Sequence, residues 1–156
     1  MKLVVLKFGG TSVADIPQIK KIALKVKKEV DLGNKVIVVV SAMSGVTNNL
    51  VDLVKEVSKN FPYSEYDTIL STGEQITSAI LSIALEELSL KARSWMGWQV
   101  PIITDNAHGK AVIKEIKTVN IKNCIKEGFV AIVSGFQGIS ENNRITTLGR
   151  GGSDTT

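Results

Sequence analysis

The chain has 156 residues, 44% of them hydrophobic and 22% charged, which suits one compact domain over residues 1–156 rather than two. Its apolar runs are much shorter than the roughly 20 residues of a membrane helix, and no secretory leader precedes the first strand, so we expect a cytoplasmic protein without a membrane span. The net charge of +4 comes from scattered lysines, which argues against a nucleic-acid partner.

The first expected element is a short aliphatic strand over residues 2–7 that ends in glycines. Apolar residues then recur at helical spacing over residues 16–30. Asp15 suits the N-cap of this helix, Pro17 its first turn, where a missing N–H has no intrahelical partner to lose, and Gly33 a left-handed stop. The sequence therefore predicts a strand, a loop and a helix with both helix ends marked.

The same unit repeats along the next residues. A continuous Val/Ile run over residues 35–41 is typical of a buried parallel strand, and an apolar stripe over residues 50–57 predicts another helix. Pro62 interrupts the pattern, and a long helical stretch then runs to Leu88. Gly73 is expected to kink or divide this stretch.

The second half predicts shorter elements. Strands over 92–96, 102–104, 112–116 and 129–134 are expected, with a helix over 119–126. Beyond residue 135 the composition turns to Gly, Ser, Thr and Asn, and we expect no further helix there. Strands that alternate with helices indicate an α/β sandwich.

The lone cysteine and the lone histidine are expected to carry no function. Cys124 falls among apolar neighbours on the helix expected over 119–126, which predicts a buried, inert thiol. His108 precedes Gly109, which predicts an exposed turn residue, and no cysteine or second histidine lies near it for a metal site.

The first candidate site is the loop Lys7-Phe8-Gly9-Gly10-Thr11-Ser12, which follows the first strand. Its glycines can bring backbone N–H groups close to an anion, and Lys7 adds a positive charge, so phosphate is the expected ligand. The residue order is neither that of a P-loop nor G-x-G-x-x-G, and a plain tight turn is the alternative.

The second candidate site is the loop over residues 41–49, at the carboxyl end of a strand, where open parallel sheets bind ligands. Ser41, Ser44 and Thr47 bring hydroxyl groups that suit carboxylate or phosphate oxygens. The alternative is that Thr47 or Asn48 caps the next helix.

The third and fourth candidate loops carry charged side chains. Glu74, in the loop over 71–75, lies between apolar helical stretches, which favours a cationic partner such as a substrate ammonium; a contact with the dipole of a new helix is the alternative. In the loop over 146–154, Arg150 suits bidentate carboxylate binding, Ser153 adds a donor, and Asp154 can hold or neutralise Lys7. A disordered glycine-rich tail is the alternative there.

Taken in order, the four loops resemble those of the aspartokinase family. The matching segments are K-F-G-G-T-S over 7–12, S-A-M-S-G-V-T over 41–47, the glutamate-bearing loop over 71–74 and G-R-G-G-S-D-T-T over 149–156. The resemblance implies the amino-acid kinase fold, a three-layer α/β/α sandwich with a mainly parallel central sheet. It also implies transfer of the ATP γ-phosphoryl group to the side-chain carboxylate of L-aspartate, giving 4-phospho-L-aspartate, the first step towards lysine, threonine and methionine.

The resemblance further implies roles for single residues. Lys7 would stabilise the transferring phosphoryl group, and Asp154 would position Lys7. Glu74 suits the ammonium of aspartate and Arg150 one of its carboxylates. The other implied contacts are Ser41, Thr47, Gly151, Gly152 and Ser153 with aspartate, and Phe8, Gly9, Gly10 and Ser12 with ATP. Magnesium arrives with the ATP, and no residue is expected to ligate a metal directly.

Aspartokinases continue into a region with adenine and ribose contacts and then into regulatory domains. We therefore interpret the chain as the N-terminal, acceptor-binding part of such a kinase domain, truncated at its C-terminus, and expect little or no activity from it alone. The full-length enzyme is expected to be a homo-oligomer. The alternatives are a sister kinase acting on glutamate, acetylglutamate, carbamate or a nucleoside monophosphate, and a non-catalytic module that binds aspartate or a partner chain.

Overall fold

The computed structural model describes residues 2–149 and 151–156, so Arg150 lies outside the described residues. Helices and strands alternate along much of the chain, as the sequence predicts. In chain order the elements are β1 (Leu3–Phe8), α1 (Ile16–Asp31), β2 (Lys35–Val40), α2 (Val46–Val57), α3 (Tyr63–Leu70), α4 (Thr72–Glu87), β3 (Ala92–Trp95), β4 (Ile102–Thr104), β5 (Ile113–Ile116), α5 (Val119–Lys126), β6 (Val130–Ser134), β7 (Gln137–Ser140), β8 (Ile145–Thr147) and α6 (Gly152–Thr155).

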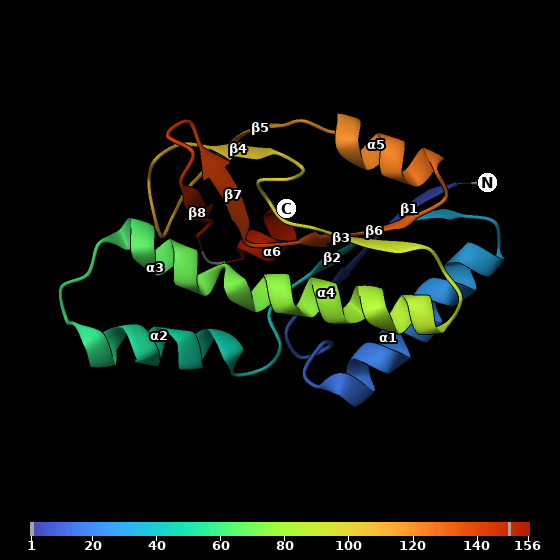
Figure 1. Cartoon of the computed structure of the whole chain (residues 1–156), viewed down its shortest axis with the longest axis horizontal. Helices are drawn as coiled ribbons and strands as arrows, with labels where there is room; N and C mark the ends of the chain where they lie inside the picture. The colour runs from blue at the N-terminus through green and yellow to red at the C-terminus, as the bar shows by residue number, and fades with distance from the viewer. Residues whose placement is uncertain (1, 150) are drawn as a thin grey trace.

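A four-stranded sheet in the order β1-β2-β6-β3 forms the centre, and every neighbouring pair in it is parallel. Figure 1 shows this sheet nearly edge-on, with α5 on one side of it and α1 and α4 on the other. The expected three-layer α/β/α arrangement with a parallel central sheet is therefore confirmed. Because parallel strands end at the same edge, the loops after β1, β2 and β6 lie together.

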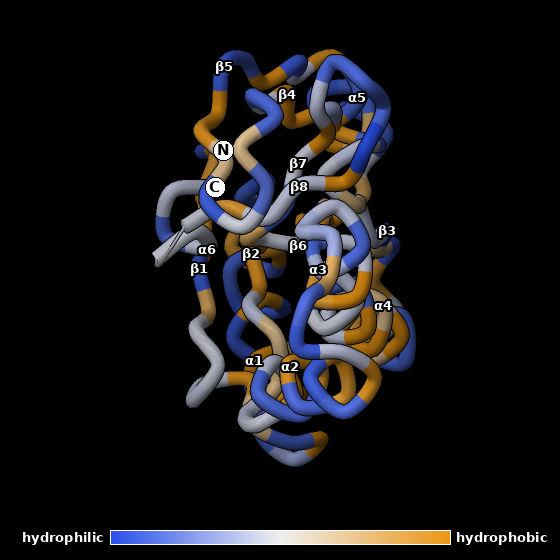
Figure 2. Tube along the Cα trace, turned by 90° about the vertical axis from the view of Figure 1, so that its left-hand side faces the viewer, coloured by the Kyte–Doolittle hydropathy of each residue, from blue (hydrophilic) through white to orange (hydrophobic). Residues whose placement is uncertain are grey.

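The strand β2 is buried on both faces, which is why it reads as a continuous Val/Ile run. Val36, Val38 and Val40 belong to the core shared with α1 and α4, whereas Val39 belongs to the core shared with α5. Figure 2 shows hydrophobic stretches along the central strands and on the helices that face them. Two cores, one on each face, thus fix the sheet between its helices.

The predicted ends of α1 are confirmed. Asp15 is the N-cap, and its Oδ1 accepts a hydrogen bond of 2.9 Å from the backbone N–H of Gln18. Pro17 lies in the first turn, and Gly33 follows the helix with φ of +79°. The helix buries Ile19, Ile22, Ala23 and Val26, the apolar side chains that recur at helical spacing.

The long helical stretch divides as expected, but α2 differs from its prediction in burial. The division falls at Ser71, between α3 and α4, just before Gly73. The apolar stripe of α2 does form a helix, yet only Val54 is buried, while Leu53 and Val57 are 56% and 88% exposed. At the edge of the central sheet, the β1 residues Leu3 and Val5 are likewise about 60% exposed.

A second sheet, in the order β5-β4-β7-β8, corrects the expectation for the end of the chain. The sequence predicts neither β7, β8 nor α6, because the residues that they bury are largely polar. Gln137, Thr146 and Thr147 are all at most 1% exposed, and they face other polar groups inside the protein. Among the residues described, no helix has the length and apolarity needed to cross a membrane.

The predicted burial of Cys124 is confirmed, and the predicted exposure of His108 is wrong. Cys124 is buried with a free thiol, and burial raises its pKa. His108 is not an exposed turn residue, because its side chain is only 18% exposed and its Nδ1 lies 2.8 Å from the carboxylate of Asp67. The sequence missed this contact because the two residues are 41 positions apart.

Candidate active site

The loops at the carboxyl edge of the central sheet enclose a cavity of about 480 Å³. All four candidate loops contribute to it. The residues singled out from the sequence that line it are Lys7, Gly9, Gly10, Ser41, Thr47, Glu74, Gly151, Gly152, Ser153 and Asp154. Segments separated by more than a hundred residues thus meet in one place.

The glycine loop after β1 presents a cation and free backbone donors to this cavity. Lys7 forms an ion pair with Asp154, and the side chains of the pair are 37% and 68% exposed. The loop turns through a hydrogen bond of 2.9 Å from Ser12 N to Gly9 O, whereas the N–H groups of Gly10 and Thr11 make no hydrogen bond within the described part of the chain. Such N–H groups beside a lysine suit phosphate oxygens.

The loop after β2 leads into α2 without a side-chain cap. The helix begins after Gly45, which has φ of +79° and occupies the N-cap position, and no side chain caps it by a hydrogen bond. Thr47 and Asn48 therefore lie inside the helix, and both line the cavity. The capping alternative for these two residues is wrong, which leaves the Thr47 hydroxyl available to a ligand.

Glu74 is a nearly fully buried carboxyl group, 3% exposed, in the first turn of α4. Its Oε1 accepts a hydrogen bond of 3.1 Å from Ala42 N, while its Oε2 has no hydrogen-bond partner among the residues that the structure describes. Burial raises the pKa of Glu74 to about 7, and the hydrogen bonds from backbone N–H groups oppose this shift. An incoming cation would therefore find an unsatisfied acceptor here.

Gly73 allows Glu74 to reach this position. A Cβ on residue 73 would lie 2.8 Å from Ala42 Cβ, closer than side-chain carbons approach one another. Because residue 73 has no side chain, α4 can pack directly against the loop after β2. The Glu74 carboxylate and the Ala42 N–H are brought within hydrogen-bond distance by that approach.

The last residues are ordered into the site rather than forming a disordered tail. Gly151, with φ of +79°, starts the short helix α6, and Gly152 is buried against Leu148 and Phe136. A Cβ on Gly135 would lie 3.0 Å from both Val40 O and Ser153 Cβ, so the glycine lets α6 approach the central strands. Ser153 and Asp154 reach the cavity in this way.

Three expected contacts are not placed in the cavity. Phe8 packs against the core between the sheet and α1, and Ser12 lies on the surface outside the cavity lining. Arg150 lies outside the described residues. Conversely, no role was predicted from the sequence for Ala42 or Phe136, which also line the cavity, and Ala42 N donates to Glu74 Oε1.

The carboxyl edge of this open parallel sheet carries a lysine, glycine loops and a buried carboxyl group. Such an edge is typical of enzymes that bind phosphorylated ligands. The model of the amino acid kinase family matches residues 2–156. The chain therefore belongs to the amino acid kinase family.

The chain is similar over its whole length to curated aspartokinases. It is 50% identical to an aspartokinase of Rickettsia bellii over 159 residues, covering 100% of this chain and 39% of that protein. It is 51% identical over 156 residues to an aspartokinase of Geobacillus stearothermophilus, covering 38% of that protein. The chain thus spans about two fifths of the length of these relatives.

Solved structures show the same fold. An aspartate kinase from Synechocystis matches with a TM-score of 0.80 and 44% identity, over 98% of this chain and 25% of that one. E. coli aspartokinase III, solved in complex with aspartate and ADP, matches with a TM-score of 0.84 over 99% of this chain and 45% of that one. At 24% identity the second likeness supports the fold alone.

Proposed function

We propose that this chain forms the acceptor-binding part of an aspartate kinase, which transfers the γ-phosphoryl group of ATP to the side-chain carboxylate of L-aspartate. The observation that carries the proposal is the buried Glu74 beside a cavity lined by hydroxyl groups: one of its oxygens accepts from Ala42 N, and the other is buried without a hydrogen-bond partner among the described residues. The relatives that are 50–53% identical to this chain are named aspartokinases or aspartate kinases, which supports the same acceptor.

The acceptor binds through charge complementarity. Glu74 Oε2 accepts a hydrogen bond from the ammonium group of aspartate. This bond gives the buried oxygen the partner that it lacks without a ligand. The hydroxyl groups of Ser41, Thr47 and Ser153 donate to the carboxylates, and Arg150 adds a bidentate cation. The side-chain carboxylate is left facing Lys7 and attacks phosphorus as the nucleophile.

The chemistry requires placement and charge neutralisation rather than a protein nucleophile. The acceptor carboxylate is already ionised at neutral pH, and it has to approach a phosphoryl group of like charge. Lys7 and the free N–H groups of Gly10 and Thr11 offset this charge, while Asp154 holds the Lys7 amine in place.

Magnesium is proposed to enter with ATP and to be held by its phosphate oxygens. Within residues 2–149 and 151–156 there is no group of three or more His, Cys, Asp or Glu side chains that could hold a metal ion. The free N–H groups beside Lys7 fit phosphate oxygens, and Asp154 forms an ion pair with that lysine. When bound, the magnesium ion neutralises phosphate charge during transfer.

Calorimetric titration of the 156-residue chain with L-aspartate tests the acceptor site. Saturable binding is expected, with affinity lowered at least about tenfold in Glu74→Gln, because a charge-assisted hydrogen bond is lost. Arg150→Ala should weaken binding similarly. Glu86→Gln changes an exposed carboxylate at the far end of the same helix and serves as the control, so equal effects of Glu74→Gln and Glu86→Gln would refute the site.

A panel of acceptors distinguishes the sister kinases of the same fold. Glutamate, N-acetylglutamate, carbamate and nucleoside monophosphates are titrated under the same conditions, and aspartate is expected to bind most tightly. Tighter binding of another acceptor would assign the site to that compound. A chain that binds aspartate but transfers no phosphoryl group in any longer form would instead be a binding module.

The 156-residue polypeptide by itself is expected to turn over little or no ATP. It spans about two fifths of the length of its aspartokinase relatives, and the proposed roles of its residues concern the acceptor and the phosphates. A coupled assay for ADP release in the presence of aspartate checks this. Ordinary turnover would show that the nucleotide site is complete within these residues.

A further inference from the structure

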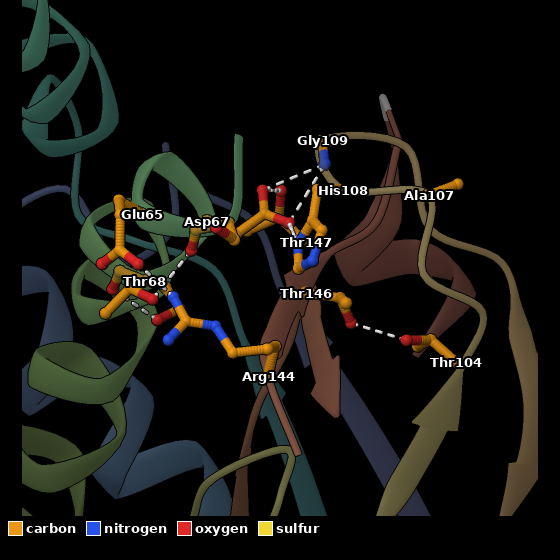
Figure 3. A network of polar contacts seen from close by, with 12 residues as sticks. Glu65, Asp67, Thr68, Thr104, Ala107, His108, Gly109, Arg144, Thr146 and Thr147 are labelled. Carbon is orange, nitrogen blue, oxygen red and sulfur yellow. Dashed lines mark hydrogen bonds and ion pairs between the residues drawn. The ribbon is translucent and has the colours of Figure 1, made fainter. Parts of the chain in front are cut away.

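Asp67 is a fully buried carboxylate at the centre of a polar network outside the cavity. It is 0% exposed, and its oxygens accept from Gly109 N at 3.0 and 3.1 Å and from Thr147 Oγ1 at 2.5 Å. His108 Nδ1 lies within hydrogen-bond distance of Asp67 Oδ2, at 2.8 Å. Figure 3 shows Asp67 on α3 facing His108, Gly109 and Thr147.

Two residues that bond to Asp67 precede charged residues of the proposed site: Ser71 precedes Glu74, and Thr147 precedes Asp154. Asp67 belongs to α3, and its carbonyl accepts from Ser71 N, the residue that joins α3 to the Glu74-bearing helix α4. Thr147 is the last residue of β8, after which the chain leads through Leu148 to Ser153 and Asp154. One carboxylate therefore ties the segment that carries Glu74 to the segment that carries Asp154.

Other contacts hold described residues of both segments between Asp67 and the cavity. The carbonyl of Ser71 accepts from Gln137 Nε2 at 2.9 Å, and Leu148 N donates to Phe136 O at 2.8 Å. Gly152 is packed against Leu148 without room for a Cβ. Through the packing of Leu148 against Gly152, a displacement at the Asp67–Thr147 contact would be passed on to the start of α6 and so to the cavity.

Burial of a carboxylate costs free energy unless hydrogen bonds replace its lost hydration, and Asp67 accepts such bonds from Gly109 N and Thr147 Oγ1. An ion pair between Glu65 of α3 and Arg144, the residue just before β8, lies nearby, but its side chains are 59% and 43% exposed, so it adds little. The buried contact is the one that can define the spacing of α3 and β8.

We infer that Asp67 is a positioning residue that, through Thr147, holds the Ser153–Asp154 segment at a fixed distance from Glu74. The inference rests on the proposed acceptor site, because it assigns the geometry of that site to a residue outside it. A misplacement of about 1 Å between binding groups costs up to about a hundredfold in a reaction, so such a contact affects function well beyond its own strength.

The test compares two buried threonine hydroxyls in the same sheet. Thr147→Val removes the hydroxyl that donates to Asp67. Thr104→Val removes the 2.6 Å contact between Thr104 and Thr146; this contact is equally buried but does not involve α3. Figure 3 shows both contacts. Aspartate affinity is measured by calorimetry, and the backbone amide resonances of residues 71–75 and 151–154 are compared by NMR spectroscopy.

Thr147→Val is expected to weaken aspartate binding about tenfold and to shift the amide resonances of both segments, while Thr104→Val changes the affinity by less than about twofold and shifts neither. Thr147→Ser, which keeps the hydroxyl, is expected to restore both readouts. Equal behaviour of Thr147→Val and Thr104→Val, or failure of Thr147→Ser to restore, would overturn the inference.

The two proposals fail separately. If the wild-type chain binds no aspartate, the proposed acceptor site fails, and the amide shifts of the two segments alone decide whether Asp67 positions them. If Thr147→Val does not fold, Asp67→Asn, which keeps the shape of the side chain, is judged by the same two readouts against Thr104→Val. Unchanged affinity and unchanged amides in Asp67→Asn would then overturn the inference.

Discussion

The Oε1 atom of Glu74 accepts a hydrogen bond of 3.1 Å from the backbone N–H of Ala42, across 32 residues of sequence. This bond joins the start of α4 to the loop after β2. It also holds the carboxyl group inside the protein, where its second oxygen has no partner among the described residues. Acceptor binding and the protonation of Glu74 are therefore expected to be linked.

Aspartate binding is expected to strengthen as pH rises from 6 to 8. The pKa of Glu74 is raised to about 7 by burial, so below that pH the carboxyl is largely protonated and attracts an ammonium group poorly. Affinity should fall about tenfold per pH unit well below pH 7. Calorimetric titration between pH 5.5 and pH 8 checks this. In Glu74→Gln the rise should be absent, and a rise that persists there would point to another group.

The ligand-free chain should become less stable as pH rises. The pKa of Glu74 in the folded state, about 7, exceeds its ordinary value of 4.5, so the folded state binds the proton more tightly and loses stability between these two values. Relative to Glu74→Gln, the loss amounts to about 3 kcal/mol by pH 8. Urea unfolding of both proteins at pH 5 and pH 8 measures it. If the difference in free energy of unfolding between the two proteins does not widen as pH rises, Glu74 is not the group that causes the loss.

Gly73→Ala is expected to destabilise the fold by about 1–3 kcal/mol, because the new methyl group overlaps Ala42 Cβ at 2.8 Å. It should also push Ala42 N away from Glu74 and weaken aspartate binding. Denaturant midpoints and titrations are compared with those of the double variant Ala42→Gly/Gly73→Ala. Recovery in the double variant identifies the overlap as the cause, whereas additive losses would exclude it.

Thr47→Val should weaken aspartate binding about tenfold and change the free energy of unfolding by less than about 0.5 kcal/mol, because Thr47 does not cap α2. Asp15→Ala should do the opposite, since Asp15 caps α1: a loss of about 1 kcal/mol with unchanged affinity. Thermal unfolding and calorimetry of both variants provide the comparison. A destabilised Thr47→Val with normal affinity would return Thr47 to a structural role.

The central α/β sandwich could be predicted because its strong patterns coincide with its burial. The Val/Ile run of β2 is buried on both faces, and the cap residue Asp15 makes the hydrogen bond that its type suggests. In the second sheet, β4 and β5 were predicted as strands, whereas β7 and β8 were not. The side chains that β7 and β8 bury are largely polar, as where Thr146 meets Thr104 inside the protein, and in the sequence such residues look like loop residues.

The sequence predicted which residues line the candidate site better than it predicted their burial and contacts. Loops that follow parallel strands meet at one edge, so Lys7 and Ser41 could be grouped from their positions alone. Asp154 follows β8 of the second sheet, and it was linked to Lys7 only by its charge and by the resemblance to a known family, so the roles of all three residues stay predictions. The degree to which Glu74 is buried depends on the approach of Gly73 to Ala42, a distance that local sequence does not contain. For the same reason the contact between Asp67 and His108 was missed.

The exposed edge of the central sheet has a consequence for work in solution. β1 pairs with β2 on one side and has no partner strand on the other among the residues that the structure describes, and its side chains Leu3 and Val5 are exposed. An open strand edge with apolar side chains is a template for further strands, so the polypeptide is expected to self-associate as its concentration rises. Replacing Val5 with lysine places a charge on that edge, and the resulting sample should stay monomeric at concentrations where the unaltered one does not.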